Sequence, residues 1–452
     1  MRAKETVAKS KTIGMVSLGC SKNQVDAERL LALLRAAGYE ISAQPESCGV
    51  VIINTCGFIE SAKQEAIEVI LEFAQLKAEG AIGGLIVTGC LSERYREEFI
   101  SEFPEVDGVL GIGRNAEITG AVDAVLRGGK YMAFGEKEAL PLEGERLLAG
   151  PAYSAYLKVA EGCDNRCSYC AIPDIRGRFR SRTMESVIEE ARVLVGAGVR
   201  EISLVAQDTT RYGEDIYGKL MLPELLIKLC GIEDLRWLRV LYCYPDRVTD
   251  QLLEVMRGQE KIVKYMDLPI QHSVGKVLRE MNRGGDEKTL RALIGRIRAH
   301  VPGITLRTTL ITGFPGESEQ DFQSLCRFVK DMRFERLGCF AYSQEEDTPA
   351  GERDDQTEPE TRQRRCEIIM ETQAGIAEEI ARNMRGREIE VLCEGYDNER
   401  NAHVGRSAAD APDVDTKVYF TAAGRCPPGM FVRVLITGAE GYDLIGQCTM
   451  DN

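Results

Sequence analysis

The chain has 452 residues, of which 44% are hydrophobic and 28% charged, and its formal net charge is −14. This length and composition are typical of a soluble globular protein with two to four domains. The N-terminus has no apolar leader-like stretch, and no run of about 18 apolar residues follows, so we expect a cytoplasmic protein without a membrane span. The acidic balance argues against stable nucleic-acid binding, because neutralising phosphates requires surplus Lys and Arg.

The first part of the chain alternates short apolar runs with amphipathic helical stretches. The apolar runs cover 12–18, 50–54, 85–88 and 106–112. Strands and helices in alternation predict an open parallel sheet with helices on its faces. A glycine-rich segment, Gly111-Ile-Gly113, superficially resembles a dinucleotide-binding turn, but it comes late in this domain, which favours a role at a helix start.

Three cysteines follow directly on predicted strands of this sheet, namely Cys20, Cys56 and Cys90. The carboxyl ends of parallel strands meet at one edge of a sheet, where ligands bind. We therefore expect these three thiols to converge and to ligate a metal centre, with one position left open. The chain has fifteen cysteines, an odd number scattered over all segments, which suits a reducing compartment better than a disulfide framework.

A charged segment rich in Gly and Pro at 135–152 is predicted to be a linker, and a second series of strand–helix units follows it. The predicted strands cover 155–160, 201–206, 237–242, 265–270, 304–312 and 336–342. Six such units predict a partial barrel, whose ligand site lies at the carboxyl ends of the strands. We predict an N-terminal domain over 1–134, the linker over 135–152, the partial barrel over 153–378 and a small C-terminal domain over 379–452.

The loop after the first strand of this series carries Cys163, Cys167 and Cys170 at C-x3-C-x2-C spacing, without a nearby fourth ligand. A structural zinc site requires four protein ligands, whereas a cubane iron-sulfur cluster held by three thiolates keeps one iron free. The spacing favours the cluster. A zinc site completed by His272 or His300, or three ordinary thiols, remains an alternative.

Polar residues also follow the other predicted strands of the barrel. Gln207, Gln271, Arg307 and Gly313 are candidates for contacts with a cofactor. His272 is a candidate for contact with the substrate, with a purely structural histidine as the alternative. After the cysteine loop, basic residues occupy alternate positions from 176 to 182, so one face of an extended segment would be strongly positive. We expect Arg176 and Arg178 to hold an acidic group of the substrate, although the cofactor carboxylate is another candidate ligand and a solvated basic edge is an alternative.

Short predicted strands at the C-terminus cover 388–393, 416–421 and 430–437. Gly, Pro and Asp separate them, which is typical of a small antiparallel barrel. Residues 380–452 contain eight Lys and Arg against eleven Asp and Glu, a balance of 8 − 11 = −3. This barrel is therefore poorly suited to hold RNA.

The six cysteines in their three-domain context resemble the radical S-adenosylmethionine (SAM) methylthiotransferases. The resemblance implies an N-terminal domain with an auxiliary four-iron four-sulfur cluster, a radical SAM partial barrel and a C-terminal TRAM domain. Cys20, Cys56 and Cys90 match the auxiliary ligands, and the C-x3-C-x2-C loop matches the radical cluster. Tyr169, just before the last of these cysteines, corresponds to an aromatic residue near the adenine of SAM. Two 4Fe-4S clusters and SAM are the cofactors that the resemblance implies.

Segments at 241–245, 306–309, 342–349 and 404–415 are similar to the branch of this family that modifies a ribosomal protein. One departure is Asp347, where Gly is usual. The resemblance implies methylthiolation of an aspartate β-carbon in the small-subunit ribosomal protein uS12, with flavodoxin or ferredoxin as a class of electron donor. Its nearest rival is methylthiolation of adenosine in transfer RNA, and a rival of another class is a non-catalytic iron-sulfur scaffold or carrier. The sequence does not reveal the actual donor, the source of the inserted sulfur or the oligomeric state.

Overall fold

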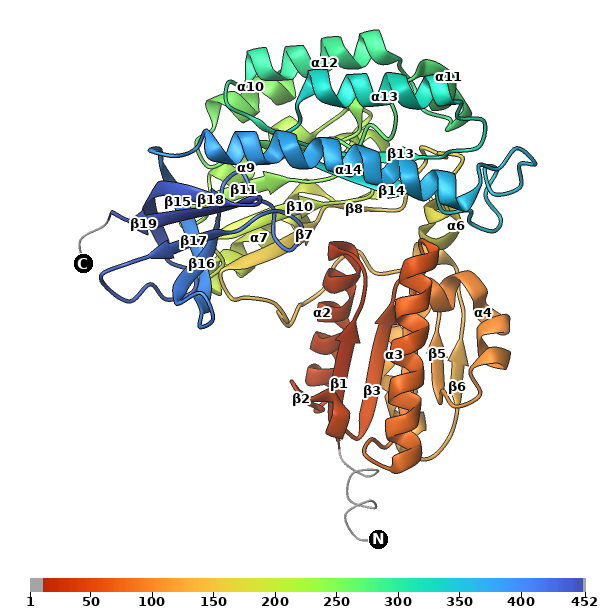
Figure 1. The fold of residues 1–452 in the computed structure, drawn as a ribbon. Helices are drawn as coiled ribbons and strands as arrows, with labels where there is room; N and C mark the ends of the chain where they lie inside the picture. The colour runs from red at the N-terminus through yellow and green to blue at the C-terminus, as the bar shows by residue number, and fades with distance from the viewer. Residues whose placement is uncertain (1–10, 450–452) are drawn as a thin grey trace. The chain divides into compact units, whose positions relative to one another are not determined.

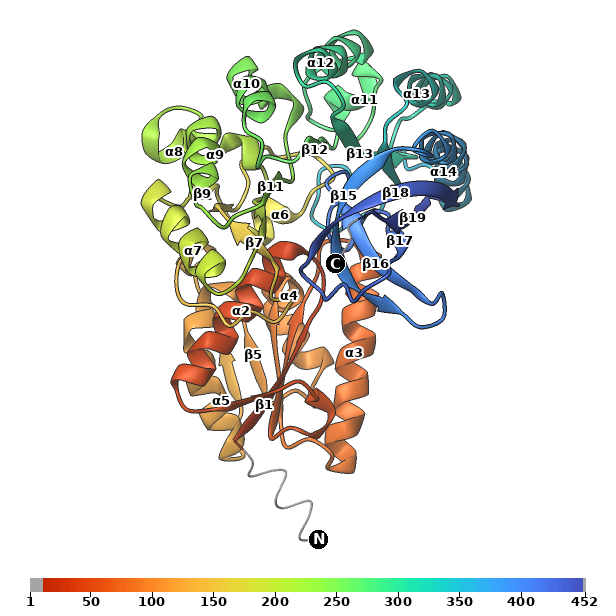
Figure 2. The same cartoon turned by 90° about the vertical axis from the view of Figure 1, so that its left-hand side faces the viewer.

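The structure, a computed structural model, describes residues 11–449, and these residues form two compact units. The first unit contains the described residues up to Gly150, residues 158–182 and residues 345–348. The second contains residues 151–157, 183–344 and 349–449. The elements of each unit are labelled in Figure 1 and seen from a second direction in Figure 2.

The first unit is built on a six-stranded parallel sheet with the order β2-β1-β3-β4-β5-β6. Its strands are β1 (Thr12–Ser17), β2 (Glu40–Ser42), β3 (Val50–Thr55), β4 (Leu85–Gly89), β5 (Gly108–Leu110) and β6 (Tyr131–Ala133). Every residue of β3 and β4 is buried, as expected for the central strands of a sheet that is covered on both faces.

Helices cover both faces of this sheet (Figure 1). One face packs on α3 (Glu60–Glu79) and α4 (Cys90–Glu102), through side chains such as Phe73 and Phe99. The other face packs on α2 (Ser21–Ala36) and α5 (Ile118–Leu126), through Leu30, Leu34 and Val122. The short 3-10 helices of the unit are η1 (Pro45–Ser47), η2 (Ile112–Glu117) and η3 (Lys137–Ala139). The predicted open parallel sheet is therefore confirmed.

The loop with the second cysteine triad also belongs to the first unit. It leaves an antiparallel pair of short strands, β8 (Ala160–Glu161) and β9 (Arg180–Ser181), and leads into α6 (Ile172–Arg176). Helix α6 contacts both α4 and η3. Both cysteine triads thus lie within one compact unit.

The second unit contains two parallel sheets, with the orders β11-β10-β7 and β12-β13-β14. A parallel bridge between Leu238 and Ile262 continues the series from β11 toward β12. The strands are β7 (Ser154–Lys158), β10 (Glu201–Val205), β11 (Trp237–Val240), β12 (Tyr265–Asp267), β13 (Thr305–Thr312) and β14 (Arg336–Ala341). All six strands were predicted, and their parallel order confirms the partial barrel.

Helices connect these strands. They are α7 (Met184–Gly196), α8 (Glu214–Tyr217), α9 (Leu222–Cys230), α10 (Asp250–Gly258), α11 (Gly275–Glu280), α12 (Glu287–His300) and α13 (Glu319–Met332), with the 3-10 helices η4 (Thr209–Arg211) and η5 (Pro245–Arg247). The long α14 (Pro359–Arg382) packs against β14 and β13, as Figure 1 shows, and leads to the C-terminal strands.

The C-terminal strands of the second unit close into a barrel with the order β15-β16-β17-β19-β18. They are β15 (Glu388–Asp397), β16 (Ala402–Ser407), β17 (Val418–Thr421), β18 (Phe431–Glu440) and β19 (Asp443–Cys448). The predicted small barrel is confirmed, although β16 and β19 were not predicted and β17 pairs with β19 in parallel.

A buried ion cluster joins this barrel to the first strands of the second unit. The Glu201 carboxylate accepts hydrogen bonds from Arg239 and from Arg406 of β16, and all three side chains are buried. The Trp237 ring packs edge-on against Phe431, with centroids 4.8 Å apart. Within residues 11–449, no helix is both long and apolar enough to cross a membrane. The domain boundaries drawn from the sequence remain a prediction.

Candidate metal centres

The first cysteine triad lies at the carboxyl edge of the first unit's sheet. Cys20 follows β1, Cys56 follows β3 and Cys90 follows β4, and these three strands are neighbours in the sheet. The charges of Cys56 and Cys20 both act on the pKa of Cys90, so the three sulfurs lie within electrostatic range of one another. The convergence expected from the sequence is present, while the role of these thiols as cluster ligands remains a prediction.

Two glycines allow the cysteine loops to approach each other so closely. Gly19 has φ +90°, and a Cβ there would lie 2.7 Å from the Cβ of Cys56. Gly89 has φ +105°, and a Cβ there would lie 2.5 Å from the backbone oxygen of Thr55. Only glycine adopts such conformations without strain and without a side chain in the gap. Each of these glycines directly precedes a cysteine of the triad, which is the local signal that marks them in the sequence.

The local electrostatics differ among the three thiols. Burial raises the pKa of Cys20, but the charges of Lys22 and Arg176, together with backbone N–H groups at the start of α2, lower it below its usual value. Burial raises the pKa of Cys56 and raises that of Cys90 to about 12, although the Arg176 charge opposes the latter shift. Without a metal centre, Cys90 is therefore a protonated thiol, and ligation requires its proton to leave.

Arg176 is the point at which the structure differs most from the sequence interpretation. We expected this arginine to contact the substrate, but its side chain is only 2% exposed. Its Nε and Nη2 atoms each lie 3.3 Å from Cys90 Sγ. Its Nη1 atom donates to Asp26 at 2.6 Å and to Glu161 at 3.2 Å. The buried position and these partners do not favour contact with a protein substrate.

The second cysteine triad lies on the loop between β8 and α6. The Cys163 N–H donates to Gly177 O at 3.1 Å, and the Cys170 N–H donates to Cys167 O at 3.0 Å. The Phe179 N–H donates to the Asp164 carboxylate at 3.1 Å, which ties the loop to the chain beyond α6. All three cysteines are half-buried, so each is neither locked in a core nor fully exposed to solvent.

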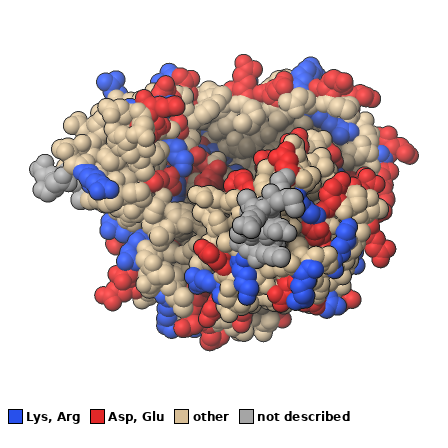
Figure 3. All heavy atoms as spheres, turned by 90° about the horizontal axis from the view of Figure 1, so that it is seen from below, with Lys and Arg blue, Asp and Glu red and all other residues tan. Residues whose placement is uncertain are grey.

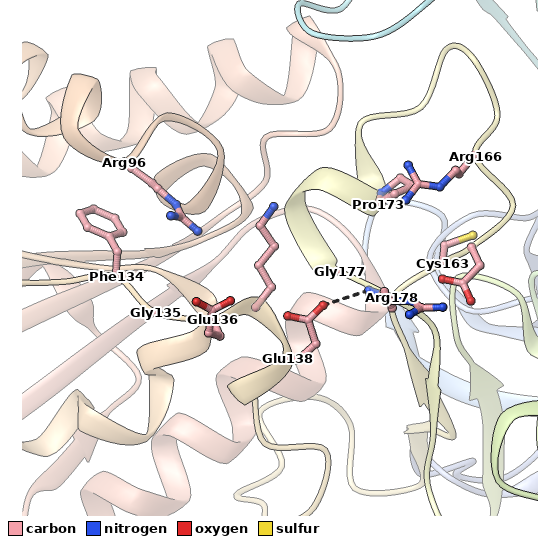
Figure 4. A pocket seen from close by; sticks show the side chains of 12 residues that line it. Arg96, Phe134, Gly135, Glu136, Glu138, Cys163, Arg166, Pro173, Gly177 and Arg178 are labelled. Carbon is pink, nitrogen blue, oxygen red and sulfur yellow. Dashed lines mark hydrogen bonds between the residues drawn. The ribbon is translucent and has the colours of Figure 1, made fainter.

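A polar cavity of about 410 Å³ borders this loop. Figure 4 shows Cys163 and Arg166 on its loop side and Glu138 directed at the backbone of Arg178, whose N–H donates to that carboxylate at 3.3 Å. The Arg178 side chain is exposed, as a substrate-binding role requires, and this role remains a prediction. Tyr169 is half-buried on the same loop, and its contact with SAM also remains a prediction.

The donor sets of both triads fit the clusters that the sequence implies. Within residues 11–449, no group of three or more His, Cys, Asp or Glu side chains is arranged to hold a single metal ion. The thiolates of a four-iron cluster bind different iron atoms, so they do not have to meet at one ion. Three thiols with N–H donors and the Arg176 cation beside them suit a negatively charged iron-sulfur cluster.

The second unit holds the barrel residues predicted to contact SAM. The half-buried Gln271 has φ +69°, and its Oε1 is buried without a hydrogen-bond partner, so it has an acceptor available for a ligand. Gln207 is likewise half-buried. Arg307 is ion-paired with Asp267 at 3.2 Å, and the Gly313 N–H donates to Glu317 at 2.8 Å. Contact of these four residues with SAM remains a prediction.

His272 differs from its predicted role. The sequence suggested substrate contact, but the side chain is fully buried, and its Nδ1 accepts from the Val274 N–H at 3.0 Å. Burial lowers the pKa of His272 to about 3, so the ring is neutral at physiological pH. Its Nε2 lies 3.7 Å from the Glu317 carboxylate. This burial favours the structural alternative for His272, and its contact with the substrate remains a prediction.

Three stretches of the chain match known protein families. Residues 157–329 match the radical SAM superfamily, residues 386–449 match the TRAM domain, and residues 12–111 match the uncharacterized protein family UPF0004. The radical S-adenosylmethionine methyltransferase TsrM from Kitasatospora setae has a similar fold, with a TM-score of 0.56 over 76% of this chain and 75% of that chain. Because that identity is only 14%, it shows the fold alone. Fold and cysteine loop together define a radical SAM protein.

Full-length relatives define the family more narrowly. A protein named ribosomal protein uS12 methylthiotransferase RimO from Pelotomaculum thermopropionicum is 48% identical over 97% of this chain and 99% of its own length. A protein of the same name from Caldanaerobacter subterraneus subsp. tengcongensis is 46% identical over 97% of this chain and 100% of its own length. The chain belongs to the RimO family of radical SAM methylthiotransferases.

Proposed function

We propose that the chain is an enzyme that inserts a methylthio group at the β-carbon of an aspartate in ribosomal protein uS12. The observation that carries this proposal is the presence of two cysteine triads in one compact unit. Relatives named uS12 methylthiotransferase match nearly the whole chain, which supports the same substrate. The protein acts in the cytoplasm, where its substrate is assembled into ribosomes.

The reaction explains why two centres are needed. The C–H bond of an aspartate β-carbon is too weakly acidic for a side-chain base to ionise, so general acid–base catalysis is insufficient. When bound, the two clusters and SAM supply one-electron chemistry and a site for the inserted sulfur. In this proposal Cys163, Cys167 and Cys170 hold the radical cluster. The triad at the edge of the first unit's sheet, with Cys90 beside Arg176, holds the auxiliary cluster.

The residues of this chain have three tasks in that reaction. Thiols must release their protons on ligation, and the N–H groups at the start of α2 already favour the thiolate of Cys20. Cys90 is buried in a small apolar cluster with Ala171 and Ile175, which excludes water from its side of the triad. In the second unit, the buried acceptor of Gln271 is suited to orient a polar group of SAM.

The surface charge supports a protein substrate over a nucleic acid. On the face drawn in Figure 3, Lys and Arg side chains are interspersed with Asp and Glu and do not form a continuous basic surface. The whole chain carries a net charge of −14, whereas a protein that binds RNA through its phosphates requires a basic surface. An acidic enzyme is better matched to a basic ribosomal protein.

A reducing flavodoxin or ferredoxin is the class of electron donor that we propose.

The decisive experiment compares cysteine variants in cells that lack the chromosomal copy of the gene. Mass spectrometry of tryptic uS12 peptides and of transfer-RNA nucleosides then shows which pool carries the methylthio group. We expect Cys167→Ala to lose both reductive SAM cleavage and the uS12 modification, and Cys56→Ala to retain cleavage without modification. Cys230→Ala, which changes a cysteine outside both triads, is the matched control and should behave as wild type.

Two results would contradict the proposal. A methylthio group on transfer-RNA nucleosides, with unmodified uS12, would assign the chain to the nucleic-acid substrate. Full modification of uS12 by the Cys56→Ala variant would show that the first triad does not hold the auxiliary cluster.

A further inference from the structure

Arg176 is a buried guanidinium that connects the helix after the second cysteine loop to the first cysteine triad. It is the last residue of α6, six positions after Cys170, and it reaches the sulfur of Cys90, the first residue of α4. Both α6 and α4 belong to the first compact unit, so this contact lies within one unit. Burying a guanidinium is costly unless all its N–H groups find acceptors. The identity of those acceptors therefore indicates what the residue does.

Two sets of acceptors share the guanidinium. On one side, Nη1 meets the carboxylates of Asp26 and Glu161, and Nη2 also donates to the side chain of Asn23. On the other side, Nε and Nη2 face Cys90 Sγ, each at 3.3 Å. An N–H group aimed at sulfur gains most when the sulfur is a thiolate, because a charged acceptor strengthens the hydrogen bond.

Neutralising the two carboxylates does not by itself account for this arrangement. Lys158 is fully buried and contacts both of them, with its Nζ 2.6 Å from Glu161 Oε2. Two cations therefore face two carboxylates within the cluster. Charge pairing explains the position of Nη1, but the Nε of Arg176 is directed at the Cys90 sulfur rather than at either carboxylate.

We propose that Arg176 is a positioning residue that donates hydrogen bonds to the Cys90 thiolate and thereby sets the reduction potential of the auxiliary cluster. This inference rests on the proposed function, since it requires that Cys20, Cys56 and Cys90 hold that cluster. Hydrogen bonds to ligand sulfurs and nearby positive charge stabilise the more negative, reduced state of an iron-sulfur cluster. Arg176 therefore makes the auxiliary cluster easier to reduce.

A purely mechanical role for Arg176 is the competing explanation. In that case the guanidinium would only connect α6, α2 and α4, and its loss would weaken folding and cluster retention without changing the potential of the clusters that remain. The two explanations differ in one measurable quantity, the midpoint potential of the auxiliary cluster in intact protein.

The test uses the full chain with Cys163, Cys167 and Cys170 all replaced by Ala, so that only the first triad can hold a cluster. In this background we compare Arg176 with Arg176→Gln, which keeps N–H donors without the charge, and Arg176→Lys, which keeps the charge without the forked donors. Arg239→Met removes an equally buried guanidinium, paired with Glu201 in the second unit, and is the matched control. Iron content and redox titration followed by electron paramagnetic resonance are measured for each.

We expect both Arg176 variants to retain iron and to have a more negative midpoint potential than the parent. The shift should be larger for Arg176→Gln than for Arg176→Lys. At a fixed potential near the parent midpoint, we expect roughly a tenfold lower ratio of reduced to oxidised cluster for Arg176→Gln, which corresponds to about 59 mV for one electron. The Arg239→Met control should have the same midpoint potential as the parent.

The possible failures are distinguishable. An unchanged midpoint in iron-loaded Arg176→Gln and Arg176→Lys proteins would overturn the positioning role and leave the proposed function intact. An equal displacement in Arg239→Met would also overturn it, since the effect would then be a general response to a lost buried cation. If the parent with only the first triad binds no iron-sulfur cluster, the auxiliary-ligand assignment itself is wrong, and this inference falls with it.

Discussion

The buried ion cluster around Glu201 should be a major support of the second unit, and Glu201→Gln tests this. The carboxylate is fully buried and accepts from Arg239 at 3.2 Å and from Arg406 at 3.0 Å. Removing one partner of a buried ion pair costs about 3–5 kcal/mol, because the remaining charge stays buried and uncompensated. Arg406 retains Glu394 at 2.7 Å and Arg239 retains a backbone oxygen at 2.9 Å. We therefore expect Glu201→Gln to lower the free energy of unfolding by about 3 kcal/mol, the lower end of that range.

The chain provides a specific assay for this loss. Trp237 is its single tryptophan, and the ring packs against Phe431 of the C-terminal barrel. Urea unfolding of cluster-free protein, followed by tryptophan fluorescence, therefore reports on the joint between this barrel and the first strands of the second unit. The control is Glu440→Gln, whose ion pair with Arg400 is exposed on the same barrel, and its midpoint should equal that of wild type. A Glu201→Gln protein within about 1 kcal/mol of wild type would refute the reasoning.

The same cluster predicts a pH dependence with a definite sign. Burial raises the pKa of Glu201, but the charges of Arg406 and Arg239 outweigh it and hold the pKa below its usual value. A carboxylate with a lowered pKa in the folded state stabilises the protein above its unfolded pKa, and this contribution is lost as the pH falls through the folded pKa. The stability difference between wild type and Glu201→Gln should therefore shrink on acidification.

Three further changes have defined outcomes. Burial lowers the pKa of His272 from 6.5 to about 3, so the folded protein loses stability as the pH falls through this range. The urea midpoint of His272→Gln should therefore change less with pH than that of wild type; parallel curves of midpoint against pH would contradict this. Gly89→Ala should lower iron content and cost at least about 1 kcal/mol, whereas Gly120→Ala, with open space around it, should do neither. Lys158→Met should cost about 3–5 kcal/mol in urea unfolding by leaving two buried carboxylates with one cation, and a wild-type midpoint would contradict this.

Much of the fold was predictable because its signals are local. The runs at 50–54 and 85–88 are continuous and apolar, as expected for strands buried on both faces, and both became central strands of the sheet. The strands β16 and β19 escaped prediction because their sequences mix small and polar residues. Ala402-His-Val-Gly-Arg-Ser407 has no clear alternation, and its pairing depends on partners far along the chain.

For the candidate site, too, the local features were predictable from the sequence and the tertiary environment was not. Cysteine spacing and strand ends are sequence-local, so both triads were predicted from residue types and positions alone. The environment of Arg176 depends on contacts with Cys90 and Asp26, 86 and 150 positions away, and the alternation of basic residues at 176–182 pointed to an exposed edge instead. His272 likewise followed a strand at the ligand-binding end, but the packing that buries it is tertiary. Polar side chains are mostly exposed, so residue type alone does not predict the burial of a particular one.

The position of the second cysteine loop has a consequence for how the two centres cooperate. Residues 158–182 leave the barrel sequence and fold with the N-terminal unit, where α6 packs on α4 and Arg176 bonds to Cys90. The spacing of the two triads is therefore determined inside one compact unit. Clusters held by the two triads would therefore have their separation set by the packing of α6 on α4, and reaction geometry tolerates little error.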